Sequence, residues 1–127
     1  MRIVVAAAII RRGNAFLLTR RQAGVHLEGY WEFPGGKCEP GESLDACLVR
    51  ELREELAVTA TVRAEIFAVT HEYDDRSVEL HFSACDLVGE PVPQQGQEMQ
   101  WVPRTELQNL TFPPADQELI GFLKTQD

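Results

Sequence analysis

Residues 35–58 read GGKCEPGESLDACLVRELREELAV, a glycine-rich loop that runs into a predicted helix. The helix places Glu51, Glu54 and Glu55 within an arc of about 100° on one face. Like charges four residues apart destabilise a helix by a few tenths of a kcal/mol, so this clustering is unfavourable without a counterion. Hard cations such as Mg²⁺ or Mn²⁺ prefer oxygen ligands and commonly bridge carboxylates to substrate phosphates. The stretch therefore predicts a divalent-metal site that acts on a phosphorylated ligand.

The alternative is an acidic helix face that meets only solvent. Three apolar side chains lie within about 60° of Glu51 around the helix, so this face is not simply polar. The preceding loop also supplies Gly35, Gly36 and Gly41, which allow the main chain to approach a ligand or metal closely. Together these two features favour a site over a solvated face.

The spacing of this stretch is the second informative feature. It runs Gly36, five residues, Glu42, seven residues, Arg50-Glu51-Leu52, one residue, Glu54-Glu55, one residue, and Ala57-Val58. This resembles the signature of the Nudix hydrolases at every defined position but Ala57, where the family pattern has Gly. Since helices often end on a residue with φ > 0, Ala57 is expected to carry about 1 kcal/mol of strain without disturbing the chemistry.

Matches outside the signature point to one branch of that family. The segments 19–21, 31–37 and 112–116, together with His26, resemble the MutT enzymes, which clean the nucleotide pool. The resemblance implies a Mg²⁺-dependent nucleoside triphosphate pyrophosphohydrolase, with Mn²⁺ able to substitute, that releases nucleoside monophosphate and pyrophosphate. The expected leading substrate is 8-oxo-dGTP, whose hydrolysis is an antimutator activity linked to DNA replication and repair. CTP, dCTP or a 5-substituted dCTP are the alternatives.

Two other functions remain open at this point. One is an enzyme of the same fold that hydrolyses a nucleoside diphosphate sugar, a dinucleoside polyphosphate or capped RNA. The other is a catalytically silent module that senses a nucleotide or binds a protein. Silent copies would be expected to lose carboxylates of the signature, and here all are present.

The resemblance also implies roles for individual residues. The expected catalytic residues are Glu51 as base or water-orienting group, Arg50 as the residue that orients the carboxylates, Glu54 and Glu55. The expected metal ligands are the Gly35 carbonyl, Glu51, Glu54, Glu55 and Glu98, with Gln95 as the alternative to Glu98 and Glu42 as an outer contact. The expected substrate contacts are Arg21, His26, Phe33, Gly36, Lys37, Arg76 and Asp116.

Asp116 is the candidate for reading the base. An ionised carboxylate only accepts hydrogen bonds, so it would favour the N4 amine of cytosine or the N7–H of 8-oxoguanine over the acceptors of guanine. The simpler alternatives are that Asp116 only favours a helix N-terminus, that Phe33 only fills the core, and that Arg21 and Arg76 only meet solvent.

Composition limits the possible partners. The 127 residues carry 12 basic and 20 acidic side chains, a net charge of −8, which argues against a surface for duplex nucleic acid. The apolar run at residues 3–10 is too short for a membrane span and indicates a buried strand. Three cysteines without paired spacing predict free thiols in a reducing, cytoplasmic environment. A monomer and a homodimer both remain open.

Hydrophobic periodicity and turn residues predict one domain over residues 1–127, of α/β (α+β) class. Arg11-Arg12-Gly13-Asn14 is expected to be a turn, Pro34-Gly35-Gly36 to stop a strand, and 71–77 to be a hairpin loop. The resemblance implies an α/β/α sandwich with a mixed β-sheet. Predicted strands cover residues 3–10, 15–20, 30–33, 59–70, 78–87 and 99–102. Predicted helical segments cover 43–56, with Ser43 as the N-cap, 105–110 and 115–123.

Overall fold

The apolar N-terminal run forms β1 (Arg2–Ile9), the strand around which the larger sheet is built. The computed structural model describes residues 1–125 and places β1 between β5 (Gly35–Lys37) and β7 (Ser77–Val88). β1 runs antiparallel to β5 and parallel to β7, and β6 (Thr59–Glu72) pairs antiparallel with β7 at the sheet edge. The sheet is therefore mixed, as the sequence predicted.

A second sheet is centred on β3 (Ala15–Arg20). This strand pairs antiparallel with β2 (Arg11–Arg12), β4 (Trp31–Glu32) and β8 (Glu98–Pro103). A six-residue 3₁₀ helix, η1 (Arg104–Asn109), follows β8, and a second short one, η2 (Pro114–Asp116), leads into α2 (Gln117–Lys124). None of the helices in residues 1–125 has the length and apolar character that crossing a membrane requires.

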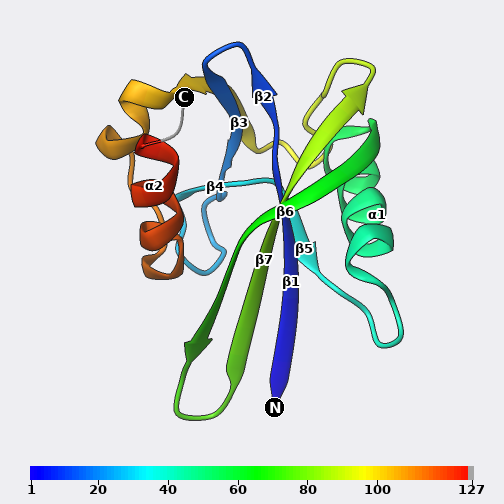
Figure 1. Ribbon diagram of the computed structural model, residues 1–127, viewed down its shortest axis with the longest axis vertical. Helices are drawn as coiled ribbons and strands as arrows, with labels where there is room; N and C mark the ends of the chain where they lie inside the picture. The colour runs from blue at the N-terminus through cyan, green and yellow to red at the C-terminus, as the bar shows by residue number, and fades with distance from the viewer. Residues whose placement is uncertain (126–127) are drawn as a thin grey trace.

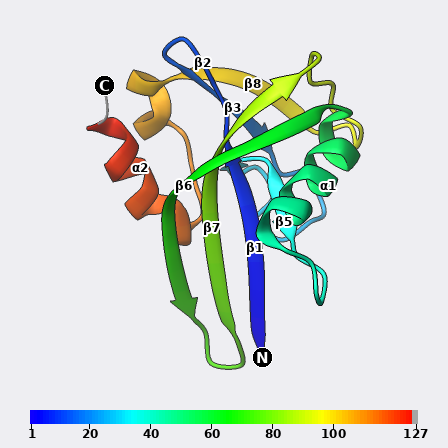
Figure 2. The same ribbon diagram turned by 45° about the vertical axis from the view of Figure 1, so that its right-hand side comes forward.

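The two α-helices lie on opposite sides of the β-structure (Figures 1 and 2). Apolar residues of α1 (Leu44–Leu56), including Leu48, Leu52 and Leu56, pack with one face of β1 and the adjoining strands. Apolar residues of α2 pack over the other face, with Phe33, Phe82 and Phe112. Side chains of β1 alternate between the two clusters, as expected for a strand covered on both faces. The predicted α/β/α sandwich is confirmed.

Both ends of α1 have recognisable caps. The Ser43 side chain accepts a hydrogen bond from the Ala46 main-chain N–H at 3.1 Å, which confirms the predicted N-cap. Ala57 ends the helix with φ 57° and ψ 37°, and its N–H donates to the Arg53 carbonyl. The left-handed conformation expected at the one departure from the family pattern is therefore present.

Several predicted boundaries differ from those of the structure, mainly because strands pair with distant partners. Gly35–Lys37 forms β5 because it pairs with β1, and Arg11–Arg12 forms β2 because it pairs with β3, so neither segment is only a turn. The 59–88 hairpin is longer than predicted, with strands that extend to Glu72 and from Ser77. The last α-helix begins at Gln117, after a 3₁₀ turn.

Candidate active site

Gly35 and Gly36 pair with β1, and an added Cβ would meet backbone atoms at Gly35 and the Glu51 carboxyl group at Gly36. Gly35 pairs with Ala7 and Gly36 with Ala6. A Cβ at Gly35 would lie 2.0 Å from the Ala6 carbonyl oxygen, and one at Gly36 would lie 2.4 Å from the Glu51 carboxyl carbon. The glycines therefore let the main chain of β5 lie directly beside the Glu51 side chain.

Arg50 connects the carboxylates of α1 to the loop before it. Its Nε donates to Glu42 at 2.7 Å and its Nη2 donates to Glu42 at 2.9 Å. Its Nη1 donates to Glu51 at 3.0 Å and to both oxygens of Glu54 at 3.2 Å, while Nη2 also donates to the Lys37 carbonyl at 3.1 Å. One guanidinium thus fixes the positions of three carboxylates, including two of the predicted metal ligands.

Glu55 is the most deeply placed carboxylate of the cluster. The Gly35 main-chain N–H donates to it at 3.3 Å. Burial, with smaller contributions from the nearby carboxylates Glu32 and Glu51, raises the pKa of Glu55 to about 8. A group of carboxylates that are costly to ionise together, next to glycine main chain, suits a hard divalent cation, which would favour their charged forms.

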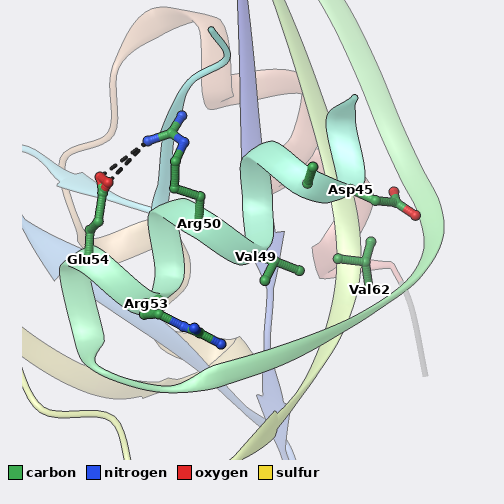
Figure 3. Close-up of a pocket in the computed structure, with 7 residues that line it drawn as sticks. Asp45, Val49, Arg50, Arg53, Glu54 and Val62 are labelled. Carbon is green, nitrogen blue, oxygen red and sulfur yellow. Dashed lines mark hydrogen bonds and ion pairs between the residues drawn. The ribbon is translucent and has the colours of Figure 1, made fainter. Parts of the chain in front are cut away.

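A cavity of about 220 Å³, here called the carboxylate cavity, brings part of this cluster together. Glu51, Glu55 and Gly35 line it, together with Gln95 and Gln97. Glu54 lies instead on the outer side of α1, where Figure 3 shows it joined to Arg50 beside a separate cavity of about 580 Å³. Arg50 is therefore the link between the inner carboxylates and Glu54.

A second cavity, of about 460 Å³, adjoins the first and is called the aromatic cavity. It lies between residues 3–7 of β1, the β6–β7 hairpin and the segment before α2. The structure brings all of the predicted substrate contacts to its lining: Arg21, His26, Phe33, Gly36, Lys37, Arg76 and Asp116.

Phe33 and Asp116 are both buried in the wall of the aromatic cavity. Phe33 stacks on Phe112 with ring centroids 5.8 Å apart and meets Phe82 edge to face at 6.1 Å, so it belongs to both the core and the cavity. Asp116 precedes α2 but makes no side-chain capping hydrogen bond. Burial, with a smaller contribution from Glu32, raises the pKa of Asp116 to about 7. In its protonated form the Asp116 carboxyl group has a hydrogen to donate, which the sequence interpretation did not anticipate.

The basic residues of the aromatic cavity differ in how firmly they are held. Arg21 donates from Nη1 to Glu32 at 3.1 Å and from Nε to the His26 carbonyl at 2.6 Å, which fixes the loop that carries His26. Arg76 lies at the tip of the β6–β7 hairpin, with its guanidinium 4.8 Å from the Tyr73 ring.

One residue was missed by the sequence interpretation, and one predicted ligand lies apart. Glu32 lines both cavities, and burial raises its pKa even though Arg21 opposes the shift. A signal was available, because Glu32 alternates with buried Trp31 and Phe33 along an extended segment. Glu98 pairs with Arg20 at 3.2 Å and does not line the carboxylate cavity, whereas Gln95, its alternative, does.

Comparison with known proteins places this geometry in a family. Residues 5–121 match the NUDIX domain. The 8-oxo-dGTP diphosphatase of Escherichia coli (strain K12) is 36% identical over 125 residues, 97% of this chain and 97% of that protein. The CTP pyrophosphohydrolase of the same organism is 40% identical over 119 residues, 93% of this chain and 88% of that protein. The solution structure of the E. coli ORF135 protein matches with a TM-score of 0.83 and 39% identity, over 97% of this chain and 86% of that one. The chain belongs to the NUDIX domain family and is a Nudix hydrolase.

Proposed function

We propose that this Nudix hydrolase is a Mg²⁺-dependent nucleoside triphosphate pyrophosphohydrolase with 8-oxo-dGTP as its leading substrate. The observation that carries the proposal is the junction of the two cavities, since Arg21, Glu32 and Gly35 line both. A nucleotide lying across this junction would have its phosphates at the carboxylates and its base beside Phe33 and Asp116. The name of the relative that is 36% identical, an 8-oxo-dGTP diphosphatase, supports this substrate.

The carboxylate cluster supplies the metal site in this proposal. The Gly35 carbonyl, Glu51, Glu54 and Glu55 would hold Mg²⁺, or Mn²⁺ in its place, and Gln95 is a better candidate than Glu98 for the extra position because it lines the cavity. A divalent cation there would neutralise phosphate charge and acidify the attacking water. The unfavourable crowding of Glu32, Glu51 and Glu55 supports this assignment.

The side chains of the protein carry out the remaining steps. Glu51, beside the glycine main chain of β5, accepts a proton from the attacking water. Arg50 keeps Glu51 and Glu54 in place through its hydrogen bonds, and Lys37 extends toward the phosphates from the edge of the aromatic cavity. Water adds to one phosphorus, the bond to the bridging oxygen breaks, and nucleoside monophosphate and pyrophosphate leave.

Phe33 and Asp116 determine base choice in this proposal. Phe33 packs against the base, and Asp116 hydrogen-bonds to its edge. With a pKa of about 7, Asp116 accepts from N7–H of 8-oxoguanine when ionised and donates to a carbonyl oxygen when protonated. The ionised form leaves unmodified guanine unpaired at its bare N7 acceptor.

Cytidine nucleotides are the second candidate substrates. A relative named CTP pyrophosphohydrolase is 40% identical, and an ionised Asp116 would accept from the N4 amine of cytosine. Hydrolysis of nucleoside diphosphate sugars or a silent binding role gains no comparable support, because the carboxylates of the signature are present and Glu51 and Glu55 line one cavity. We treat residues 1–127 as a single catalytic domain, and the free thiols support a cytoplasmic location.

A substrate panel tests the proposal. We expect 8-oxo-dGTP to be hydrolysed to monophosphate and pyrophosphate only when Mg²⁺ or Mn²⁺ is present, with kcat/KM more than about tenfold above that for dGTP. The same measurement on dGTP, dCTP and CTP ranks the two candidate bases. In Asp116→Asn, the ratio between these substrates should change.

The matched control is Glu118→Gln, which also neutralises a carboxylate next to the start of α2 but on an exposed side chain. Unchanged substrate ratios in Asp116→Asn would remove Asp116 from base choice. Release of orthophosphate in place of pyrophosphate, or no metal-dependent turnover of any triphosphate, would refute the proposed reaction.

A further inference from the structure

A second group of side chains that could bind a metal ion lies along the β5–α1 loop and the start of α1. Cys38 follows β5, Glu42 lies in the loop and Cys47 lies in the first turns of α1. One ligand atom from each residue, the two Sγ atoms and a carboxylate oxygen, lies within 4.8 Å of the other two. Cys47 is fully buried, whereas Cys38 and Glu42 are half-buried and therefore reachable from solvent.

Local hydrogen bonds hold the loop in this arrangement. The Cys38 N–H donates to the Val4 carbonyl at 2.8 Å, which anchors the beginning of the loop to β1. The Glu39 N–H donates to the Glu42 side chain at 2.9 Å, and the Glu42 N–H donates to the Glu39 carbonyl at 3.0 Å. The three side chains therefore face one another because the main chain is fixed on both sides of them.

The chemistry of this group differs from that of the carboxylate cluster. Two sulfurs and one carboxylate suit a thiophilic ion, whereas an all-oxygen cluster suits Mg²⁺. Tetrahedral Zn²⁺, with Zn–S bonds of about 2.3 Å, holds two sulfur ligands about 3.8 Å apart. Since the ligand atoms already lie within 4.8 Å of one another, a shift of about 1 Å would bring them to that geometry.

We propose that Cys38, Glu42 and Cys47 form a second metal site, selective for a thiophilic divalent cation such as Zn²⁺. A cavity of about 770 Å³, lined by Cys38 and Glu42 among others, opens onto the group and provides the entry path and a water as fourth ligand. The buried Cys47 thiol gives up its proton on binding, and the positive charge of the ion offsets the burial that otherwise disfavours the thiolate.

The proposed site contacts the nucleotide site through two of its residues, Glu42 and Cys47, and the Cys47 thiol donates to the Gly36 carbonyl at 3.7 Å. Glu42 uses its two oxygens to hold Arg50, at 2.7 and 2.9 Å, and a cation on Glu42 would compete for that charge. The metal site itself does not depend on the reaction proposed above, because neither thiol takes part in that reaction, although Lys37 lines both its cavity and the aromatic cavity. Its test can therefore rely on binding and spectra alone.

The experiment uses the full chain under a phosphine reductant, with a large excess of Mg²⁺ to occupy the carboxylate cluster. Equilibrium dialysis should find one Zn²⁺ retained per chain. Replacement by Co²⁺ should produce a thiolate-to-cobalt charge-transfer band in the near ultraviolet, which no carboxylate site can give. In Cys38→Ser, the intensity of the band should fall by at least about half, because one of two thiolates is lost, and the Kd for Zn²⁺ should rise at least about tenfold.

Cys85→Ser is the matched control, because Cys85 is a buried free thiol outside the group. It should keep both the band and the affinity for Zn²⁺. Thermal midpoints without metal verify that each variant is folded, and Cys38→Ser is preferred to a Cys47 variant because its side chain is only half-buried. Absence of the band in wild type, or a band of unchanged intensity in Cys38→Ser, would overturn the proposal. A Cys38–Cys47 disulfide that survives the reductant and excludes the metal would overturn it as well.

Discussion

At the scale of single residues, Glu51 has the position that a base requires, between the main chain of β5 and the Arg50 guanidinium. Glu51→Gln should lower kcat by at least about 100-fold, because it removes a proton acceptor and a metal ligand. The thermal midpoint should change little, since Glu51 makes no core contact. The measurement pairs kcat with thermal unfolding, and Glu118→Gln serves as control. Activity within about tenfold of wild type would exclude this role for Glu51.

Ala57 offers a test at the same scale that concerns stability alone. Its φ of 57° is unfavourable for a residue with a Cβ. Ala57→Gly should raise the free energy of unfolding by a few tenths to about 1 kcal/mol, with kcat nearly unchanged. Ala46→Gly, an exposed position in the first turn of α1, should instead lower it by up to about 1 kcal/mol. Urea unfolding measures both free energies. Changes of the same sign in Ala57→Gly and Ala46→Gly would contradict the strain assigned to Ala57.

At the scale of elements, the packing of β5 against α1 depends on the missing side chain of Gly36. In Gly36→Ala, the new Cβ would lie 2.4 Å from the carboxyl group of Glu51, which is the end of a flexible side chain and can move away. We therefore expect a small loss of stability but a fall in kcat of about 100-fold, the cost of displacing a reacting group by about 1 Å.

Gly121→Ala provides the control for this element. It lies in α2, where an added Cβ meets nothing within 4 Å. It should raise stability by up to about 1 kcal/mol and leave kcat unchanged. If Gly36→Ala retained full activity, the close approach of β5 to Glu51 would have no catalytic importance.

At the scale of the whole molecule, buried acid groups should make stability depend on pH. The pKa of Asp116 rises from 3.8 in the unfolded chain to about 7 in the folded protein, through burial and then Glu32. Folding therefore takes up a proton between about pH 4 and pH 7, so the free energy of unfolding falls as pH rises through this window. In metal-free protein, Asp116→Asn should lose less stability than wild type between pH 5 and pH 8. If urea titrations showed equal losses of unfolding free energy in wild type and Asp116→Asn, the pH dependence would come from groups other than Asp116.

The sequence predicted the parts of this molecule that depend on local signals. The α1 helix, its Ser43 cap and the strained Ala57 follow from residues within a few positions of one another. β5 was missed because its strand character comes from pairing with β1, about 30 residues away, and its own Gly-Gly sequence indicates a turn. Glu98 was favoured by its charge, but the loop before β8 turns Gln95 and Gln97 toward the carboxylates and leaves Glu98 paired with Arg20.

The parallel pairing of β1 with β7 has a consequence for synthesis on the ribosome. Residues 2–9 align with residues 77–84, so β1 has only β5 as a partner until the chain has grown past residue 84. A nascent chain that already contains β5, the β5–α1 loop and α1 still exposes one unpaired, apolar edge of β1. Such edges promote association between chains. Chaperone capture or slow translation would therefore affect association between chains most strongly while residues 60–84 emerge, after the catalytic signature has been synthesised.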